Sequence, residues 1–584
     1  MNPLHAHLSD LLAPVVAALG VQRPGDMGVS EPPSRIAGFH ACSNAPLRLA
    51  RELKRPPIEI AHDLAAALTG ADGIETAEAC IPGFVNVRFT ADTLARLGTL
   101  APVFENANGL TVLDFGGPNI KPMHVGHLRS LVLGETIRRI LVATGHTVMS
   151  DVHWGDWGLP SGMILALLRR EHPDHPCFTE FGSQALLPVR AADVARIYPA
   201  AAALAKADDT FAVEAREATR ALQAGEPRLL ALWDALCAEA KANIGLTFER
   251  LGAHFDLSLG ERDAQADVPV VMAMARASGI CREEDGVLLV PVALPSDPKE
   301  PPPLVLQRAD GSSLYAATDL ATLVARMRDL APSRVVYVVD GRQNLHFTQT
   351  FRAARLLGIV PSVVELTHRP FGTVNAPDGK PFRTRDGETM PLGELLDTAV
   401  AAALQRLDEG GRVPEAERAL TAECVGLAAV RIADMSQTAV NGYVLDVDRI
   451  VRFEGNTGSA LLYSVVRLRS VLGRAAASGI VASDSVVAAL MVPGEAGETA
   501  AALVLRMAAY GQALQSAADE MEPFRLTEWA FSTSSAVGRF WNACPLLTEP
   551  DMEVCSARVA LAALVEAQMS GALEILGCRI PEAM

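Results

Sequence analysis

The stretch that decides the fold is Leu110-Thr-Val-Leu-Asp-Phe-Gly-Gly-Pro-Asn-Ile-Lys-Pro-Met-His-Val-Gly-His127. Its first six residues predict a short apolar strand, its Gly/Pro-rich part predicts a loop, and the periodic residues His124 to Thr144 predict a helix ending before Gly145. Residues 147–153 then predict a second strand. A strand, loop, helix and strand form a βαβ unit, which implies a parallel sheet that binds its ligand at the carboxyl ends of the strands.

The same alternation resumes downstream. Arg334 to Val339 predicts a strand, a helix follows through Gly358, and Ser362 to Thr367 predicts the next strand. The stretch between, from about 165 to 300, has helical patterns of its own and predicts an insertion. After about residue 395 the strand signals vanish, and long Ala/Leu/Val-rich stretches predict a bundle of helices.

The first hundred residues have a different pattern. Amphipathic stretches at Leu11 to Leu19 and Leu47 to Leu68 accompany an alternating segment, Gly83 to Phe89, that predicts a strand. We therefore expect an α/β plus all-α protein. A small α+β domain is expected over 1–108, a Rossmann-type parallel-sheet domain over 109–398 with its insertion at about 165–300, and a helical-bundle domain over 399–584.

Composition excludes several classes of protein. With 584 residues, 49% of them hydrophobic and 20% charged, the chain is neither disordered nor fibrous. Its longest apolar stretches fall well short of the roughly 20 residues that span a bilayer. No membrane segment is expected, and the absence of a basic run before an apolar core argues against a secretory signal. We expect a cytoplasmic protein.

The net charge and the cysteines exclude further kinds of partner and site. A net charge of −17 argues against non-specific attraction to nucleic-acid backbone, but a specific nucleic-acid partner depends on local patches. The nine cysteines are scattered singly, without a C-x-x-C pair, so neither a disulfide framework nor a zinc ribbon is indicated. The sequence predicts no protein-bound metal site.

Two histidines mark the candidate phosphate site. His124 and His127 stand at the start of a helix directly after a strand, where helix-end N–H groups and the macrodipole favour anions. Gly126 between them lets a nucleotide approach the backbone, and the imidazoles can donate hydrogen bonds to phosphate oxygens. The alternative is that both histidines only cap the helix.

Six blocks in order carry a resemblance to a known family. They are Pro118-Asn-Ile-Lys-Pro-Met-His-Val-Gly-His127, His153-Trp-Gly-Asp-Trp-Gly158, Leu251-Gly-Ala-His-Phe-Asp256 with Gly260-Glu261, Leu314-Tyr-Ala-Ala-Thr-Asp-Leu-Ala321 with Val336 to His346, Phe371 to Arg385, and Phe453-Glu-Gly-Asn-Thr-Gly458 with Leu462-Tyr463. Together they resemble arginyl-tRNA synthetases, a family of class I aminoacyl-tRNA synthetases.

The resemblance implies an arginine–tRNA ligase. Such an enzyme activates L-arginine with ATP and Mg²⁺ and passes it to the terminal ribose of tRNA(Arg). The implied partners are tRNA(Arg), L-arginine and ATP, and we expect a monomer. The resemblance also assigns the two terminal domains to tRNA binding, with the anticodon held by the helical domain.

Charge chemistry points to a guanidinium pocket. A buried guanidinium needs planar acceptors, because a carboxylate can accept two parallel N–H bonds and an unpaired buried charge is costly. Asp114 and Asp319 are the candidates, and Tyr315 shares a helical face with Asp319. The alternative is that Asp319 is only a helix-capping carboxylate, which an isolated Tyr-x-x-x-Asp spacing would favour.

The resemblance assigns the remaining site residues. Groups that hold the α-amino and carboxylate ends of arginine are expected at Gly117, Pro118, Asn119, His127 and Gln343. Groups that bind ATP are expected at His124, Gly126, His127, His346, Lys380, Arg383 and Arg385. Many members of the family lack the Lys-Met-Ser-Lys-Ser loop and use a lysine before the first histidine, and Lys121 takes that place as a catalytic residue beside His124 and His127. The alternative for the basic loop is a solvated surface.

Arginines in the two terminal regions are candidates for tRNA contacts. Arg48, Arg51 and Arg55 have the spacing of one helical face, and Arg467 and Arg474 repeat at seven. A solvent-exposed charged face explains any single one of them equally well.

The sequence departs from the family pattern in four places. One residue separates Asn119 from Lys121 where the family usually has two, Pro160-Ser161 and Ser459-Ala460 replace other pairs, and Arg383 stands where lysine is usual. These departures motivate an alternative: a diverged paralogue that adenylates arginine for a non-tRNA acceptor, or binds tRNA without charging it.

Overall fold

The computed structural model describes residues 2–21, 26–32, 38–179, 187, 191–309, 311–382, 389–411 and 413–584. The chain divides into two compact units. One comprises Met1–Glu105, Ala402–Ser436 and Ile450–Met584, and the other comprises Asn106–Ala401 and Gln437–Arg449. In the described ranges, no helix has both the length and the apolar character that a membrane span requires.

The second unit is built on a four-stranded sheet with the order β11-β10-β5-β6, and all three strand pairings are parallel. Its strands are β5 (Leu110–Phe115), β6 (Thr147–Asp151), β10 (Arg334–Asp340) and β11 (Glu365–Phe371). Val335, Val336 and Val338 of β10 are buried although they point to both faces, as expected of a central parallel strand. The predicted parallel sheet is confirmed, although β6 ends earlier and β11 lies further along the chain than the sequence indicated.

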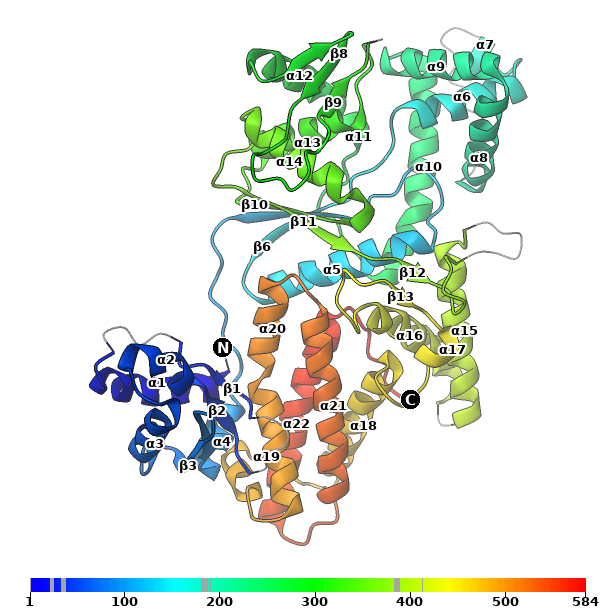
Figure 1. Ribbon diagram of the computed structural model, residues 1–584. Helices are drawn as coiled ribbons and strands as arrows, with labels where there is room; N and C mark the ends of the chain where they lie inside the picture. Colours follow the sequence, from blue (N-terminus) through cyan, green and yellow to red (C-terminus); the bar gives the residue numbers. More distant parts are fainter. Residues whose placement is uncertain are drawn as a thin grey trace. The chain divides into compact units, whose positions relative to one another are not determined.

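Helices cover both faces of this sheet (Figure 1). On one face lies α5 (Leu128–Ala143), preceded by a 3-10 turn at Val125–His127, and on the other lie α13 (Tyr315–Asp329) and α14 (Asn344–Leu356). Side chains of β5 alternate between the faces: Phe115 packs under Gly134 of α5, and Val112 joins the core formed with α13 and α14. The helix predicted from His124 to Thr144 is confirmed.

The predicted insertion contains seven helices and a small antiparallel sheet among the described residues. These elements are α6 (Leu159–Glu171), α7 (Pro176–Thr179), α8 (Ala191–Ala207), α9 (Asp209–Gln223), α10 (Pro227–Leu251), α11 (Glu261–Ala264), α12 (Val268–Ala277), β7 (Arg282–Glu284), β8 (Val287–Val290) and β9 (Leu304–Gln307). Helix α10 ends at Gly252, which takes a left-handed conformation that glycine adopts without strain.

The N-terminal part of the first unit is an α+β fold, as predicted. Its antiparallel sheet has the order β1-β2-β4-β3. The elements are α1 (Pro3–Ala18), β1 (Val29–Ser30), β2 (Ala41–Ser43), α2 (Ala45–Leu53), α3 (Pro57–Leu68), β3 (Ile74–Cys80), β4 (Phe84–Phe89) and α4 (Ala91–Gly98). The amphipathic stretch at Leu47 to Leu68 forms two helices, because Lys54 adopts a left-handed conformation and Pro56-Pro57 starts the next helix.

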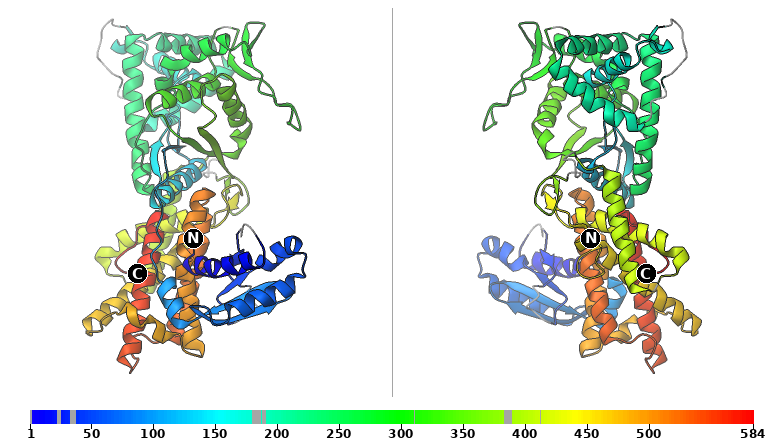
Figure 2. Two further views of the ribbon diagram at one scale, coloured as in Figure 1. Left: turned by 90° about the vertical axis from the view of Figure 1, so that its left-hand side faces the viewer. Right: turned by 90° about the vertical axis from the view of Figure 1, so that its right-hand side faces the viewer.

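Helices dominate the rest of the first unit, where α18, α19, α20, α21 and α22 pack beside one another (Figure 2). The helices after residue 390 are α15 (Leu392–Gly410), α16 (Glu415–Asp434), α17 (Val447–Ile450), α18 (Gly458–Ala477), α19 (Glu495–Ala508), α20 (Tyr510–Asp519), α21 (Phe524–Ala543) and α22 (Met552–Ile575). Two short strands, β12 (Val374–Asn375) and β13 (Tyr443–Val444), pair in parallel within the second unit. No local pattern in the sequence predicted β13.

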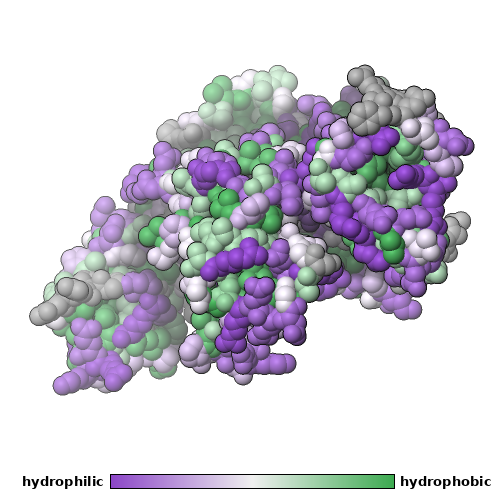
Figure 3. Space-filling model, turned by 90° about the horizontal axis from the view of Figure 1, so that it is seen from above, coloured by the Kyte–Doolittle hydropathy of each residue, from purple (hydrophilic) through white to green (hydrophobic). Residues whose placement is uncertain are grey.

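The surface carries both kinds of side chain. In the view of Figure 3, hydrophilic side chains are interspersed with apolar ones. A charged and mixed surface fits the composition, in which acidic residues exceed basic ones.

Candidate active site

The candidate site lies at the carboxyl edge of the parallel sheet. Strand β5 ends at Phe115 and leads to the histidine pair, and the neighbouring strand β10 ends at Asp340 and leads through a 3-10 turn, Gly341–Gln343, into α14. Ser130 fastens the two together, since its hydroxyl accepts from the Gly116 N–H (2.7 Å) and donates to the Val338 carbonyl (2.9 Å). Both loops therefore open at the edge where parallel sheets bind ligands.

The two histidines cap each other and the helix start. The Gly126 N–H donates to Nδ1 of His124, and the His124 N–H donates to Nδ1 of His127, each over 3.1 Å. The ring centroids lie 4.0 Å apart. Because Nδ1 of His124 accepts, its neutral ring carries the proton on Nε2 and can donate it to a ligand. Nδ1 of His127 lies 3.1 Å from the His124 nitrogen and 3.2 Å from the His124 carbonyl oxygen, so its Nε2 is a donor in the tautomer that accepts from the His124 N–H. Helix capping and phosphate donation are therefore compatible roles.

Both imidazoles are held neutral. Burial lowers the pKa of His127 to about 3, with the neighbouring His124 adding to the effect. Burial also lowers the pKa of His124, and the nearby Lys121 ammonium lowers it further. At neutral pH the pair consists of hydrogen-bond donors without charge, and positive charge at this end of the site comes from other residues.

The loop before the histidines packs against the Trp-Gly-Asp-Trp-Gly block. Asn119 forms an isolated parallel bridge with Gly155, and the Gly155 N–H donates to the Pro118 carbonyl (3.2 Å). A Cβ at Gly155 would overlap the Asn119 side chain, and one at Gly117 would overlap the His153 carbonyl. Asn119 therefore remains against this block although the loop is one residue short, and Gly117 is needed for the close approach.

Lys121 faces the insertion. Its ammonium lies 5.3 Å from the ring centroid of Tyr198 in α8, within the range of a cation–π interaction. Lys121 is therefore held between the histidine pair, whose pKa values it lowers, and a helix of the insertion.

The basic loop comprises residues 376–390, and its two described ends make backbone hydrogen bonds. At its far end the Val125 N–H donates to the Met390 carbonyl, and the Leu392 N–H donates to the Met123 carbonyl, each over 3.0 Å. At its near end the Ala376 N–H donates to the carbonyl of exposed Lys380 (2.7 Å). Arg383 and Arg385 lie outside the described residues.

Asp319, Tyr315 and His346 meet between α13 and α14. Nε2 of His346 lies 2.6 Å from a carboxylate oxygen of Asp319, and its ring centroid lies 5.0 Å from that of Tyr315. Both α13 residues therefore share one face, as their spacing predicted. Tyr315 is 63% exposed and the Asp319 carboxylate is partly open, so the cluster is accessible to a ligand. Gln343 stands exposed at the start of α14.

Glu261 joins this cluster, and sequence reasoning gave it no role. Burial raises the pKa of Glu261 to about 7, with the Asp319 and Asp156 carboxylates adding to the rise. Glu261 begins α11, and its N–H donates to the Trp154 carbonyl (3.0 Å). The available signal was its place in the Gly260-Glu261 block, where a Cβ at Gly260 would crowd Asp156.

Asp114 is occupied by a guanidinium of the chain itself. Nη2 of Arg326 lies 2.5 Å from Asp114 and 2.6 Å from Asp151, which are neighbours on β5 and β6. All three side chains are nearly or fully buried. Burial raises the pKa of Asp114 while the charge of Arg326 opposes that rise. The expected role of Asp114 in binding the substrate does not fit these contacts.

Among the described residues, one group of side chains has the spacing of metal ligands, and it belongs to this cluster. Ligand atoms of Asp114, Asp151 and His153 lie within 4.8 Å of one another. The Arg326 guanidinium already sits against both carboxylates, and a cation in that position repels a metal ion. This cluster is suited to a buried ion pair.

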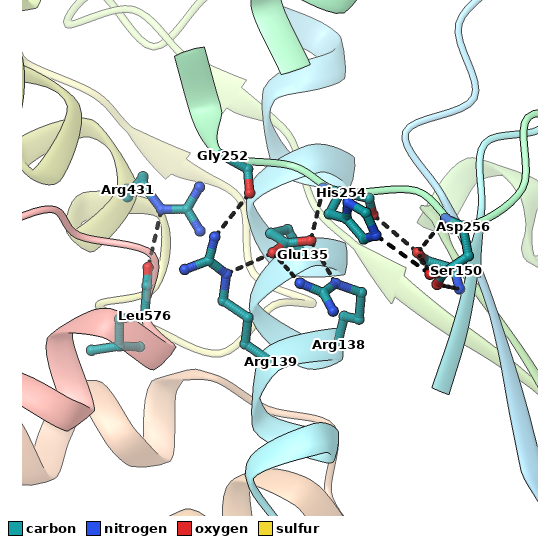
Figure 4. A network of polar contacts seen from close by, with 9 residues as sticks. All are labelled: Glu135, Arg138, Arg139, Ser150, Gly252, His254, Asp256, Arg431 and Leu576. Atoms are coloured by element: carbon teal, nitrogen blue, oxygen red, sulfur yellow. Dashed lines mark hydrogen bonds and ion pairs between the residues drawn. The ribbon is translucent and has the colours of Figure 1, made fainter. Parts of the chain in front are cut away.

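A second polar network fixes the Leu-Gly-Ala-His-Phe-Asp block to the base of the site (Figure 4). The fully buried Glu135 of α5 accepts from Arg138 and Arg139, and from the His254 N–H (3.1 Å). Asp256 accepts from the hydroxyl and N–H of Ser150, each over 2.8 Å. The network ties α5 and β6 to the residues after α10.

Three family models match along the chain: the arginyl tRNA synthetase N-terminal domain over residues 6–89, the catalytic domain of class I tRNA synthetases (R) over 98–447, and the DALR anticodon-binding domain over 461–584. The chain belongs to the class I arginyl-tRNA synthetases. The predicted fold class, with its α+β, parallel-sheet and helical parts, is confirmed.

Relatives match the synthetase over its length. The chain is 38% identical to an arginine–tRNA ligase of Maricaulis maris over 599 aligned positions, covering 100% of both chains. It is 37% identical to one of Agathobacter rectalis over 561 positions, covering 93% of each. The predicted class of enzyme, an arginine–tRNA ligase, is confirmed by these matches.

Solved structures share the fold. An arginyl-tRNA synthetase of Thermus thermophilus superposes with a TM-score of 0.80 at 22% identity, and all of both chains is covered. One of Plasmodium falciparum superposes with a TM-score of 0.79 at 19% identity, covering 100% of this chain and 99% of the other.

The candidate tRNA arginines of the synthetase have varied surroundings. Arg48 pairs with Asp26 (2.7 Å), and Arg467 lies 4.2 Å over the Trp541 ring. Arg51 and Arg474 lie in the last turns of α2 and α18. The expectation that Arg55 shares a helical face with Arg48 and Arg51 is wrong, because α2 ends at Leu53.

Proposed function

We propose that this synthetase activates L-arginine with ATP and transfers it to tRNA(Arg) with the groups at the carboxyl edge of its parallel sheet. One observation carries the assignment: adjacent strands β5 and β10 deliver the neutral histidine pair and the Asp319–His346 cluster to the same edge. An in-line reaction needs the cationic substrate and the triphosphate to be held side by side.

Asp319 is the proposed acceptor for the arginine guanidinium. Its carboxylate is partly open, and the phenol of Tyr315 lies beside the same imidazole. Glu261 supplies a second carboxylate that loses its proton when a guanidinium arrives. Asp114 is left out of this pocket because Arg326 already satisfies it.

The other end of arginine meets the loop after β5. We assign its α-amino and carboxylate groups to Asn119, Gln343, the Gly117-Pro118 backbone and His127; of these, Gly117, Asn119 and Gln343 are exposed. Asn119 and Gly117 support this role by their close approach to the Trp-Gly-Asp-Trp-Gly block.

ATP enters as its Mg²⁺ complex. The Nε2–H groups of His124 and His127 donate to phosphate oxygens, and exposed Gly126 leaves room for the nucleotide near the backbone. Lys121 and Lys380 supply positive charge, which the neutral imidazoles do not. His346 lies at the junction of the two substrates, and Arg383 and Arg385 belong to the same basic loop.

Two steps follow. A carboxylate oxygen of arginine attacks the α-phosphorus of ATP, an O–P bond forms, and pyrophosphate leaves with the electrons of the broken bond. A hydroxyl of the terminal ribose then attacks the arginyl carbonyl carbon, loses its proton and displaces AMP. Catalysis in the first step is positioning and charge stabilisation.

The proposed division of labour follows the domains expected from the sequence. Residues 1–108 and 399–584 bind tRNA, and residues 109–398 carry the chemistry. The matched N-terminal and DALR models support this assignment. Arg48, Arg51, Arg467 and Arg474 remain proposed tRNA contacts.

ATP–pyrophosphate exchange tests the proposal. Exchange that requires both arginine and tRNA(Arg), together with arginine transfer to that tRNA, is the expected result. Exchange with arginine but no transfer to tRNA would indicate another acceptor. Absence of arginine-dependent exchange under either condition would refute the assignment of the site.

A further inference from the structure

Arg129 is a buried arginine that the reaction scheme does not use. It follows His127 by two residues and is 1% exposed. Its Nη1 donates to the carbonyls of Asn441 (2.7 Å) and Gly372 (3.1 Å). Its guanidinium also lies 5.3 Å from the Tyr443 ring centroid. One side chain at the start of α5 therefore holds two distant segments of chain.

Those two segments lie side by side. The Gly372 N–H donates to the Ala439 carbonyl (3.0 Å), and the Tyr443 N–H donates to the Thr373 carbonyl (3.0 Å). A Cβ at Gly372 would stand 2.5 Å from the Gly442 nitrogen, so this approach requires glycine. The contact is a tight parallel pairing that continues as β12 with β13.

The first segment leads directly into the basic loop. Strand β11 ends at Phe371, β12 follows, and the loop with Lys380 begins at residue 376. The far end of that loop returns to Val125 through Met390. Both ends of the basic loop are therefore fixed to one element, the turn and helix start that carry His124, His127 and Arg129.

The second segment, residues 437–449, is called the connecting segment. It packs as part of the second unit, while the chain on either side of it, up to Ser436 and from Ile450, packs as part of the first. The first unit, which contains the helices after residue 450, is called the helical unit below. Because the backbone is continuous, a displacement at either end of the connecting segment would also move the residues that pair with β12.

We propose that Arg129 is a positioning residue that holds the connecting segment against the base of the basic loop and couples tRNA binding by the helical unit to arginine activation. A planar guanidinium suits this place, because it donates to two carbonyls while stacking on an aromatic ring, which an ammonium does less well. The inference rests on the proposed function for its kinetic readout.

The test compares Arg129→Met and Arg129→Lys with the wild-type full chain. In Arg129→Met, kcat for exchange in the presence of tRNA(Arg) is expected to fall about 100-fold, because small misplacements of charged groups cost that much. The KM for arginine and the Kd for tRNA(Arg) should each stay within about threefold, since Asp319 and the helical unit are untouched. Arg129→Lys should recover part of kcat.

Hydrogen–deuterium exchange tests the contact between Arg129 and the connecting segment independently of enzymatic activity. Amides of Tyr443 and Leu445, which donate to Thr373 and Asn375, should exchange at least about tenfold faster in Arg129→Met, because the pairing opens locally. Amides in the middle of α5 should keep their wild-type rates. A wild-type protein inactive with arginine would refute the proposed function and leave this readout intact.

Arg431→Met is the matched control. Arg431 is also 1% exposed, and its Nε donates to the Leu576 carbonyl (3.0 Å) within the helical unit. Unchanged amide exchange or unchanged kcat in Arg129→Met would overturn the proposal, and so would the same pattern in Arg431→Met. If Arg129→Met does not fold, Gly372→Ala opens the same pairing and is judged by the same outcomes.

Discussion

Two clusters of acidic side chains include residues of helix α13, and they differ in the group that each carboxylate contacts. Asp114 and Asp151 share Arg326, which projects from α13, while Asp319 of the same helix faces His346. The contact distances are alike, between 2.5 and 2.6 Å. Burial separates them, because the first cluster is closed and the Asp319 side chain is 30% exposed. A carboxylate with a permanent buried cation is structural, and one with an exchangeable partner can bind substrate.

The largest effect is expected from Arg326→Met. Removing this guanidinium leaves two buried carboxylates without their cation, and breaking a buried pair in this way costs about 3–5 kcal/mol. Urea unfolding measures the loss. Arg328→Met is the control, because Arg328 is an exposed arginine on the same helix and should cost less than about 1 kcal/mol. Equal unfolding free energies of the two variants would contradict the structural role of the Arg326 cluster.

Asp319→Asn should act on the substrate instead. Without the Asp319 charge, the guanidinium of arginine would enter a partly buried pocket that lacks its main negative partner. The kcat/KM for arginine should therefore fall about 100-fold or more. The KM for ATP should stay nearly unchanged, and steady-state exchange kinetics report both. Asp329→Asn, an exposed acid on the same helix, is the control. Normal arginine kinetics in Asp319→Asn would remove Asp319 from the pocket.

A smaller effect concerns pH. The pKa of Glu261 is raised from its ordinary value to about 7 by burial and by nearby Asp319 and Asp156. Its contribution to stability is therefore complete below about pH 4.5 and is lost as pH rises through about 7. Unfolding free energies at pH 5, 7 and 8 should show this decline in the wild type and not in Glu261→Gln.

Arginine binding should depend on the same protonation of Glu261. A guanidinium favours ionised Glu261, so the KM for arginine should fall as pH rises from 6 to 8, by at most about tenfold per pH unit. The other titratable groups that face this site, Asp319, His346 and Asp156, are unchanged in Glu261→Gln. A pH dependence of KM that survives in Glu261→Gln would show that Glu261 is not its cause.

Much of the fold could be predicted because its signals are local. The six apolar residues before the Gly/Pro loop and the periodic helix after His124 define the βαβ unit, and Gly145 ends its helix in a left-handed conformation. The shared face of Tyr315 and Asp319 follows from helical spacing, and both residues do lie beside His346.

The errors arise where distant residues decide the outcome. Arg326 lies more than two hundred positions from Asp114, so no local pattern announces that pair. The pKa of Glu261 depends on carboxylates contributed by other segments. The end of α2 at Leu53 depends on the backbone of Lys54, which helical spacing alone does not reveal. The two-residue strand β13 exists because β12 lies beside it.

The mutual capping of the histidines makes this site sensitive to acid. A proton added to Nδ1 of either ring turns the acceptor of a backbone hydrogen bond into a second donor facing it. The unfolded chain takes up that proton from pH 6.5 downward, while folded His127 resists until about pH 3. Acidification towards about pH 3 should therefore weaken the 3-10 turn Val125–His127, which holds the two imidazoles in place.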